Sequence, residues 1–168
     1  MLERPDVIAG DLSSRQLRSI GMATSGPPPS LLQFDAAHLP FRAASFALAL
    51  ARHMLYHVPD PRQAVAEAAR VICHDGLFVA TTNSSSSRPE LQDAHTEAVT
   101  DLGDRLVERM STNFDAESGG PKLAGSFRRV HAEQWSGVLA FPAVDGVLDY
   151  YRSTAYFKMA FDSKGPRG

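Results

Sequence analysis

Short apolar runs alternate with amphipathic stretches along the first half of the chain. Each run is four to six residues long, and the one at 46–50 carries no charge, as expected of a buried strand. The predicted strands span residues 7–10, 31–34, 46–50 and 77–82. Between them, apolar positions recur every three or four residues, first at 13–23, which indicates helices that cover a sheet. This alternation predicts an α/β fold with a mostly parallel, doubly wound sheet.

The helix expected between the third and fourth strands has the clearest signals. Asp60 is a favourable N-cap, Pro61 suits the first helical position, and Gln63 lies three residues after the cap. The apolar face of a helix over 61–72 consists of Ala64, Val65, Ala68, Ala69 and Ile72. We expect this face to pack on the sheet and the helix to end before Gly76.

The second half of the chain has a different pattern. Ser87 and Glu90 form a capping-box pattern in front of an apolar stripe that continues to Met110, which predicts a long helix. Residues 130–135 and 138–141 have the pattern of two strands, which predicts a late antiparallel hairpin at the edge of the sheet. Further helices are expected at 122–127 and 144–156.

Composition and charge narrow the class of protein. The chain has 168 residues, of which 43% are hydrophobic and 21% charged, so we expect one domain over residues 1–160 and a flexible tail at 161–168. The net charge is −2 without a basic stripe, which excludes a general nucleic-acid binder. The longest apolar stretch, 43–51, is far shorter than the roughly 20 residues of a membrane span, and no signal-peptide pattern opens the chain. We therefore expect a cytoplasmic protein with neither nucleic acid nor membrane as a partner.

Cysteine and histidine usage bears on metals and catalysis. Cys73 is the single cysteine, which excludes an internal disulfide, and we expect it to be buried at a helix end. His53 and His57 flank Tyr56, but no third ligand follows a recognised spacing, so we expect no metal. His57, His53 and Tyr56 are candidates for a catalytic base, since a neutral imidazole accepts a proton near pH 7. The alternative is that the histidines only hydrogen-bond the backbone of a loop.

Two aspartates follow predicted strands, where doubly wound sheets bind their ligands. One carboxylate at such a position can accept hydrogen bonds from both hydroxyls of a ribose, which suits Asp11. Asp35 lies beside Leu39, Pro40 and Phe41, where a flat base could stack while the acid accepts from an exocyclic amine. The alternatives are that Asp11 only caps the following helix and that Asp35 only closes a turn.

Four segments together resemble a known family. They are residues 35–46 (DAAHLPFRAASF), 51–61 (ARHMLYHVPDP), 68–72 (AARVI) and 76–83 (GLFVATTN). In this order and at these spacings they are similar to a class I S-adenosylmethionine-dependent methyltransferase of the small-molecule type. The resemblance runs from about Val7 to Asn83, and residues 114–154 resemble the C-terminal region of some members.

The resemblance implies a Rossmann-like fold, S-adenosyl-L-methionine as cofactor and a small-molecule methyl acceptor. Asp11 would hold the ribose, Asp35 would face the adenine amino group, and Arg52 would lie near the methionine part. His57 would lie in the segment that lines the mouth of the active site. The cofactor-binding residues implied in this way are Asp11, Leu12, Asp35, Ala36 and Arg52.

The chain also departs from the family pattern. It begins at what would be the family's second strand, so the first strand and the glycine-rich loop after it are missing, and we interpret the chain as N-terminally truncated. We expect the missing strand to belong between the strands that precede Asp11 and Asp35. Exposed sheet edges would then favour self-association. The alternative function is a non-catalytic methyltransferase-like module that binds a partner subunit or a small ligand.

Overall fold

The computed structural model describes residues 6–23, 28–101, 113–154 and 157. The chain divides into two compact units, one formed by 1–83 with 113–131 and the other by 84–112 with 132–168. The single domain expected over 1–160 stays a prediction, and the expected tail at 161–168 lies outside the described residues. No helix within the described ranges is both long and apolar enough to cross a membrane.

The first unit contains a pair of parallel strands near the N-terminus. Strand β1 (Ile8–Asp11) pairs with β2 (Ser30–Gln33), and helix α1 (Ser14–Ala23) connects them and buries Leu17. The expectation that a missing strand separates these two was wrong, because they form a continuous ladder in which Asp11 lies opposite Gln33. In the described residues, neither β1 nor β2 has a second strand partner.

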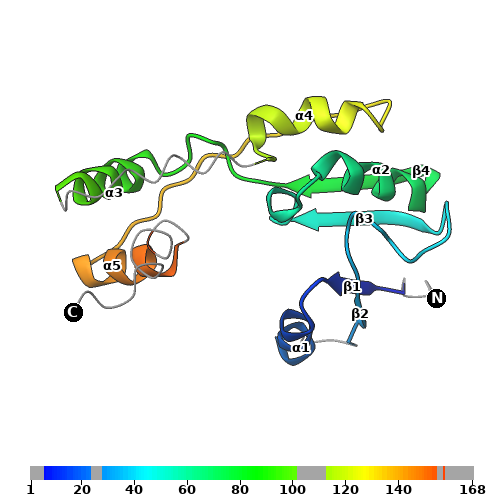
Figure 1. Ribbon diagram of the computed structural model, residues 1–168, viewed down its shortest axis with the longest axis horizontal. Coiled ribbons are helices and arrows are strands. Elements are labelled where there is room, and N and C mark those ends of the chain that lie inside the picture. Colours follow the sequence, from blue (N-terminus) through cyan, green and yellow to red (C-terminus); the bar gives the residue numbers. More distant parts are fainter. Residues whose placement is uncertain (1–5, 24–27, 102–112, 155–156, 158–168) are drawn as a thin grey trace. The chain divides into compact units, whose positions relative to one another are not determined.

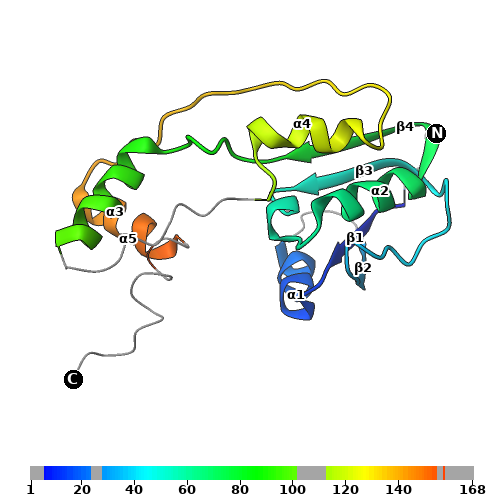
Figure 2. The same ribbon diagram turned by 45° about the horizontal axis from the view of Figure 1, so that its top comes forward.

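A second parallel pair follows in the same unit. Strand β3 (Phe46–Arg52) and strand β4 (Ile72–Thr81) run side by side and in the same direction (Figure 1). The crossover between them contains a 3₁₀ turn (Leu55–His57) and helix α2 (Pro61–Val71). Both views show α2 along this pair of strands (Figure 2). Parallel strands joined by helical crossovers are the Rossmann-like architecture that the sequence predicts.

The start of β4 differs from the prediction, which placed this strand at 77–82. Helix α2 stops at Val71 and β4 begins directly at Ile72, before Gly76, because Ile72 already pairs with Phe46. A register shift between Phe46 and Leu48 accommodates the extra residues 73–76. Cys73 therefore lies in a strand and is exposed, which corrects the expectation of a buried thiol, and its Sγ donates to the Ala44 carbonyl at 3.2 Å.

Helix α2 anchors the core of this unit. Asp60 caps it as predicted, since its side chain accepts from the amides of Arg62 at 3.0 Å and Gln63 at 3.2 Å. Ala64 and Val65 are buried, the latter completely. The cluster of buried core residues around them consists of Ala51, Leu55, Val58, Ala64, Val65 and Phe114. One face of the predicted helix therefore packs on the sheet.

The remaining helices are α3 (Pro89–Asp101), α4 (Ala116–Ala124) and α5 (Val144–Ser153). The predicted continuation of α3 to Met110 lies outside the described residues. Helix α4 begins six residues earlier than the predicted segment at 122–127, because Asp115 and Ser118 form a capping box.

The prediction of a late antiparallel hairpin was wrong. Residues 128–141 contain no strand, and the side chains of Trp135 and Val138 are 81% and 92% exposed. An isolated two-stranded hairpin is at best marginally stable in water, and this segment pairs with no sheet edge in the described residues. An apolar alternation is therefore not sufficient here to form strands.

Candidate functional site

Asp11 closes β1 and begins a turn that leads into α1. Its Oδ1 accepts from the Ser13 amide at 2.7 Å, and the Ser13 hydroxyl in turn accepts from the Gln16 amide at 3.4 Å. Ser13 is therefore the residue that caps α1, and Asp11 closes the turn before it, which corrects the alternative that Asp11 itself caps the helix. The turn occupies one carboxylate oxygen, and the second makes no hydrogen bond within the described part of the chain. A carboxylate has about four acceptor positions, so the turn leaves room for a ligand.

Asp35 makes the same turn after β2. Its Oδ1 accepts from the Ala37 amide at 2.8 Å, and Oδ2 lies 3.4 Å from Nδ1 of His38. The hydrogen bond from the Ala37 amide holds the pKa of Asp35 below its usual value, with a smaller contribution from His38. The carboxyl group is therefore ionised at neutral pH and, being exposed, can accept hydrogen bonds from a ligand.

The two aspartates lie at the carboxyl ends of adjacent parallel strands in one sheet. Asp11 lies opposite Gln33 in the ladder, and the Phe34 amide donates to the Asp11 carbonyl at 3.2 Å. The Gln33 side chain donates to the Leu12 carbonyl at 2.8 Å. Hydrogen bonds thus join the two turns immediately beside their carboxylates.

The apolar neighbours of Asp35 form part of the fold. Phe41 packs edge-on against Phe34, with ring centroids 5.4 Å apart, and against Phe46 at 4.9 Å. Ala36 and Ala37 pack against the core cluster around Val65. The segment after Asp35 is thereby held between the two strand pairs of the unit.

The third group of predicted residues follows β3. Arg52 ends the strand, and His53 adopts a left-handed backbone with φ of 48° while its amide donates to the Thr81 carbonyl at 3.0 Å. The Tyr56 ring lies 4.4 Å from that of His57 and 6.5 Å from that of His53. The candidate base residues are thus neighbours in one turn, and both histidines are exposed. No hydrogen bond or ion pair in the described ranges joins Arg52 to Asp11 or Asp35.

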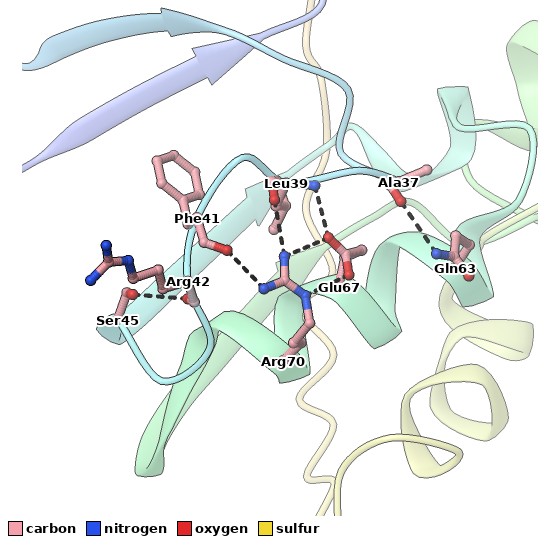
Figure 3. A network of polar contacts seen from close by, with 8 residues as sticks. All are labelled: Ala37, Leu39, Phe41, Arg42, Ser45, Gln63, Glu67 and Arg70. Atoms are coloured by element: carbon pink, nitrogen blue, oxygen red, sulfur yellow. Dashed lines mark hydrogen bonds and ion pairs between the residues drawn. The ribbon is translucent and has the colours of Figure 1, made fainter.

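Sequence reasoning missed two residues that hold the segment after Asp35. Glu67 and Arg70 of α2 form an ion pair at 2.7 Å and contact the backbone of Leu39 and Phe41 (Figure 3). Their spacing of three on a helix was the available signal, but such pairs are common on solvated faces.

Within the described ranges, no three side chains of the histidine, cysteine, aspartate or glutamate type come together as metal ligands. The residues with which the site can act chemically are the two aspartates and the group after β3.

Comparisons with known proteins agree with this arrangement. Residues 2–80 match a family described as a methyltransferase domain, a span that ends within β4. No curated protein matches the chain significantly.

Solved structures share the fold at low sequence identity. An S-adenosylmethionine-dependent methyltransferase of Thermotoga maritima is 21% identical, with a TM-score of 0.52 over 71% of this chain and 53% of its own. A protein of Bacillus halodurans assigned as a methyltransferase is 20% identical, with a TM-score of 0.52 over 71% and 52%. One of Anabaena variabilis, assigned to an antibiotic biosynthesis pathway, is 17% identical, with a TM-score of 0.56 over 74% and 46%.

The chain thus spans about half the length of these structures. Its two parallel strand pairs and helical crossovers correspond to their Rossmann-like fold. The resemblance to the S-adenosylmethionine-dependent methyltransferases is therefore confirmed, in that residues 2–80 match the methyltransferase domain family and the fold is shared with these structures.

Proposed function

We propose that this chain functions in S-adenosylmethionine-dependent methyl transfer to a small-molecule acceptor. The observation that carries the proposal is the pair of matching aspartate turns at the ends of paired strands β1 and β2. In our proposal, Asp11 binds the ribose hydroxyls and Asp35 the adenine amino group, with Leu12 and Ala36 beside them.

The donors and acceptors fit the adenosine half of the cofactor. Ribose hydroxyls and an exocyclic amine are donors, and each aspartate keeps an oxygen that can accept from them. The methionine half has less support, because the sequence contains no Gly-x-Gly-x-Gly segment whose amides would receive its carboxylate. Arg52 is the candidate contact for that half.

The chemistry requires little from the protein beyond alignment. The bound cofactor supplies a methyl group on a sulfonium, which is already activated toward displacement. The protein then contributes chiefly by holding the acceptor in line with it. Where the acceptor is a hydroxyl or amine that must lose a proton, we propose His57 or His53 as the base, with Tyr56 as a neighbouring candidate.

The experiment is a calorimetric titration of the chain with S-adenosylhomocysteine. Removing hydrogen bonds to a charged acceptor costs about 1.5–3 kcal/mol each. We therefore expect Asp11→Ala to weaken binding at least about tenfold, while the exposed Asp75 serves as a matched control through Asp75→Ala. Equal affinity in the Asp11→Ala variant and the parent would leave Asp11 with only its role in the turn before α1.

A further inference from the structure

Two side chains of α2 connect that helix to the segment after Asp35. The Leu39 amide donates to Oε2 of Glu67 at 2.9 Å. Arg70 donates from Nη1 to the Phe41 carbonyl at 2.7 Å and from Nη2 to the Leu39 carbonyl at 2.9 Å. Figure 3 shows the guanidinium between these carbonyls and the Glu67 carboxylate. Backbone groups on both sides of Pro40 are thus bound by one ion pair.

Glu67 and Arg70 act as a unit because they also bind each other twice. Nε of Arg70 lies 2.7 Å from Oε1 of Glu67, and Nη2 lies 2.7 Å from Oε2. Such a two-pronged contact fixes the plane of the guanidinium, so its remaining donors point at the backbone carbonyls. The hydrogen bonds from Arg70 hold the pKa of Glu67 below its usual value, which keeps the pair ionised at neutral pH.

The segment bound in this way begins at Asp35. The Ala37 amide holds the Asp35 carboxylate, and the Ala37 carbonyl accepts from the Gln63 side chain of the same helix at 3.4 Å. Phe41, at the other end, is packed between Phe34 and Phe46. Helix α2 therefore contacts the segment at Ala37, Leu39 and Phe41, and these contacts fix the path of the backbone from which the Asp35 side chain projects.

We propose that Glu67 and Arg70 are positioning residues for adenine recognition, because they hold the turn that orients the Asp35 carboxylate. This inference rests on the proposed function. The exocyclic amine of adenine donates a hydrogen bond to a correctly placed carboxylate. Hypoxanthine has a carbonyl oxygen at the same position, and this oxygen repels the carboxylate. The parent protein should therefore prefer adenosine to inosine, and this preference should depend on the ion pair in α2.

The test uses Arg70→Lys, with Arg62→Lys as its matched control on an exposed position of the same helix. Lysine keeps the charge but carries no planar fork that can serve the carboxylate and two carbonyls together. We expect adenosine affinity to fall about tenfold in Arg70→Lys, inosine affinity to change much less, and Arg62→Lys to match the parent. Glu67→Gln, which removes the charge of the partner, should reproduce the loss of preference.

Hydrogen exchange of the Leu39 amide provides the second readout, because this amide donates to Glu67 without any ligand. Faster exchange at Leu39 in Arg70→Lys, together with a reduced adenosine-to-inosine ratio, would support the proposal. An unchanged ratio in both Arg70→Lys and Glu67→Gln would overturn the positioning role. A parent protein that binds neither nucleoside would overturn the proposed function instead. In that case the exchange of the Leu39 amide still tests the ion pair, and exchange as slow in both variants as in the parent would show that the pair does not hold this segment.

Discussion

The Asp35 carboxylate illustrates how local chemistry prepares a single residue for recognition. Its turn is closed by the Ala37 amide, a contact that stabilises the ionised form. The sequence predicted this residue because the acid follows a strand and lies beside an apolar segment, where a flat base could stack while the carboxylate accepts from an exocyclic amine. It did not predict that α2 would hold the same segment, since Glu67 and Arg70 meet Leu39 only in the folded chain.

Asp35 should also determine which base is preferred. An asparagine at this position presents an amide that can donate to the carbonyl oxygen of hypoxanthine. We predict that Asp35→Asn weakens adenosine binding and shifts the preference toward inosine by about tenfold, measured by calorimetric titration of both nucleosides. Asp75→Asn is the control. A variant that retains the preference of the parent would show that Asp35 does not read the base.

His95 gives the second unit a dependence on pH. Burial lowers its pKa below the usual 6.5, and Nδ1 lies 2.7 Å from the hydroxyl of Tyr151. Below pH 6.5 the unfolded chain gains a proton more readily than the folded one, so stability declines as the pH falls toward the folded pKa. We predict a smaller loss between pH 7.5 and 5.5 in His95→Gln, measured by urea unfolding. Parallel pH profiles for parent and variant would contradict this.

Among the elements, α2 was predicted almost to the residue, whereas the start of β4 was not. Its cap, proline and apolar face are local signals, and Asp60 uses them as expected. The start of β4 depends instead on pairing with Phe46, which no local pattern encodes. The absent hairpin at 130–141 shows the same principle, because strands need a partner as well as an alternation.

The packing of α2 gives a direct test of the register. Val65 is fully buried, while the next residue, Ala66, is exposed. An unpaired charge at position 65 would lose its hydration without compensation. We predict that Val65→Asp fails to fold, as judged by circular dichroism and thermal melting, whereas Ala66→Asp melts like the parent. A Val65→Asp variant that melts like the parent would show that this face is not in the core.

At the scale of the whole molecule, one face of the β3–β4 pair stays uncovered within its own unit. Leu48 pairs with Leu77 and Leu50 with Val79, and all four side chains are exposed. Contiguous apolar patches of this kind commonly mark contact surfaces.

We therefore predict self-association of the 168-residue chain, detected by light scattering, through this face as well as through unpaired strand edges. Leu48→Lys combined with Leu77→Lys should reduce the associated fraction, because both charges would have to be buried in the contact. Leu139→Lys combined with Val144→Lys, two substitutions of the same kind at exposed positions outside this face, is the control. Association that is unaffected by the double substitution would assign it to another surface.

The central claim is that the ends of β1 and β2 form the adenosine site, and amide NMR during an adenosine titration tests it most directly. The prediction is saturable shifts concentrated at Leu12, Ser13, Ala36 and Ala37, with affinity reduced in Asp11→Ala. Saturable shifts confined to other segments, with these four amides unmoved, would contradict the account.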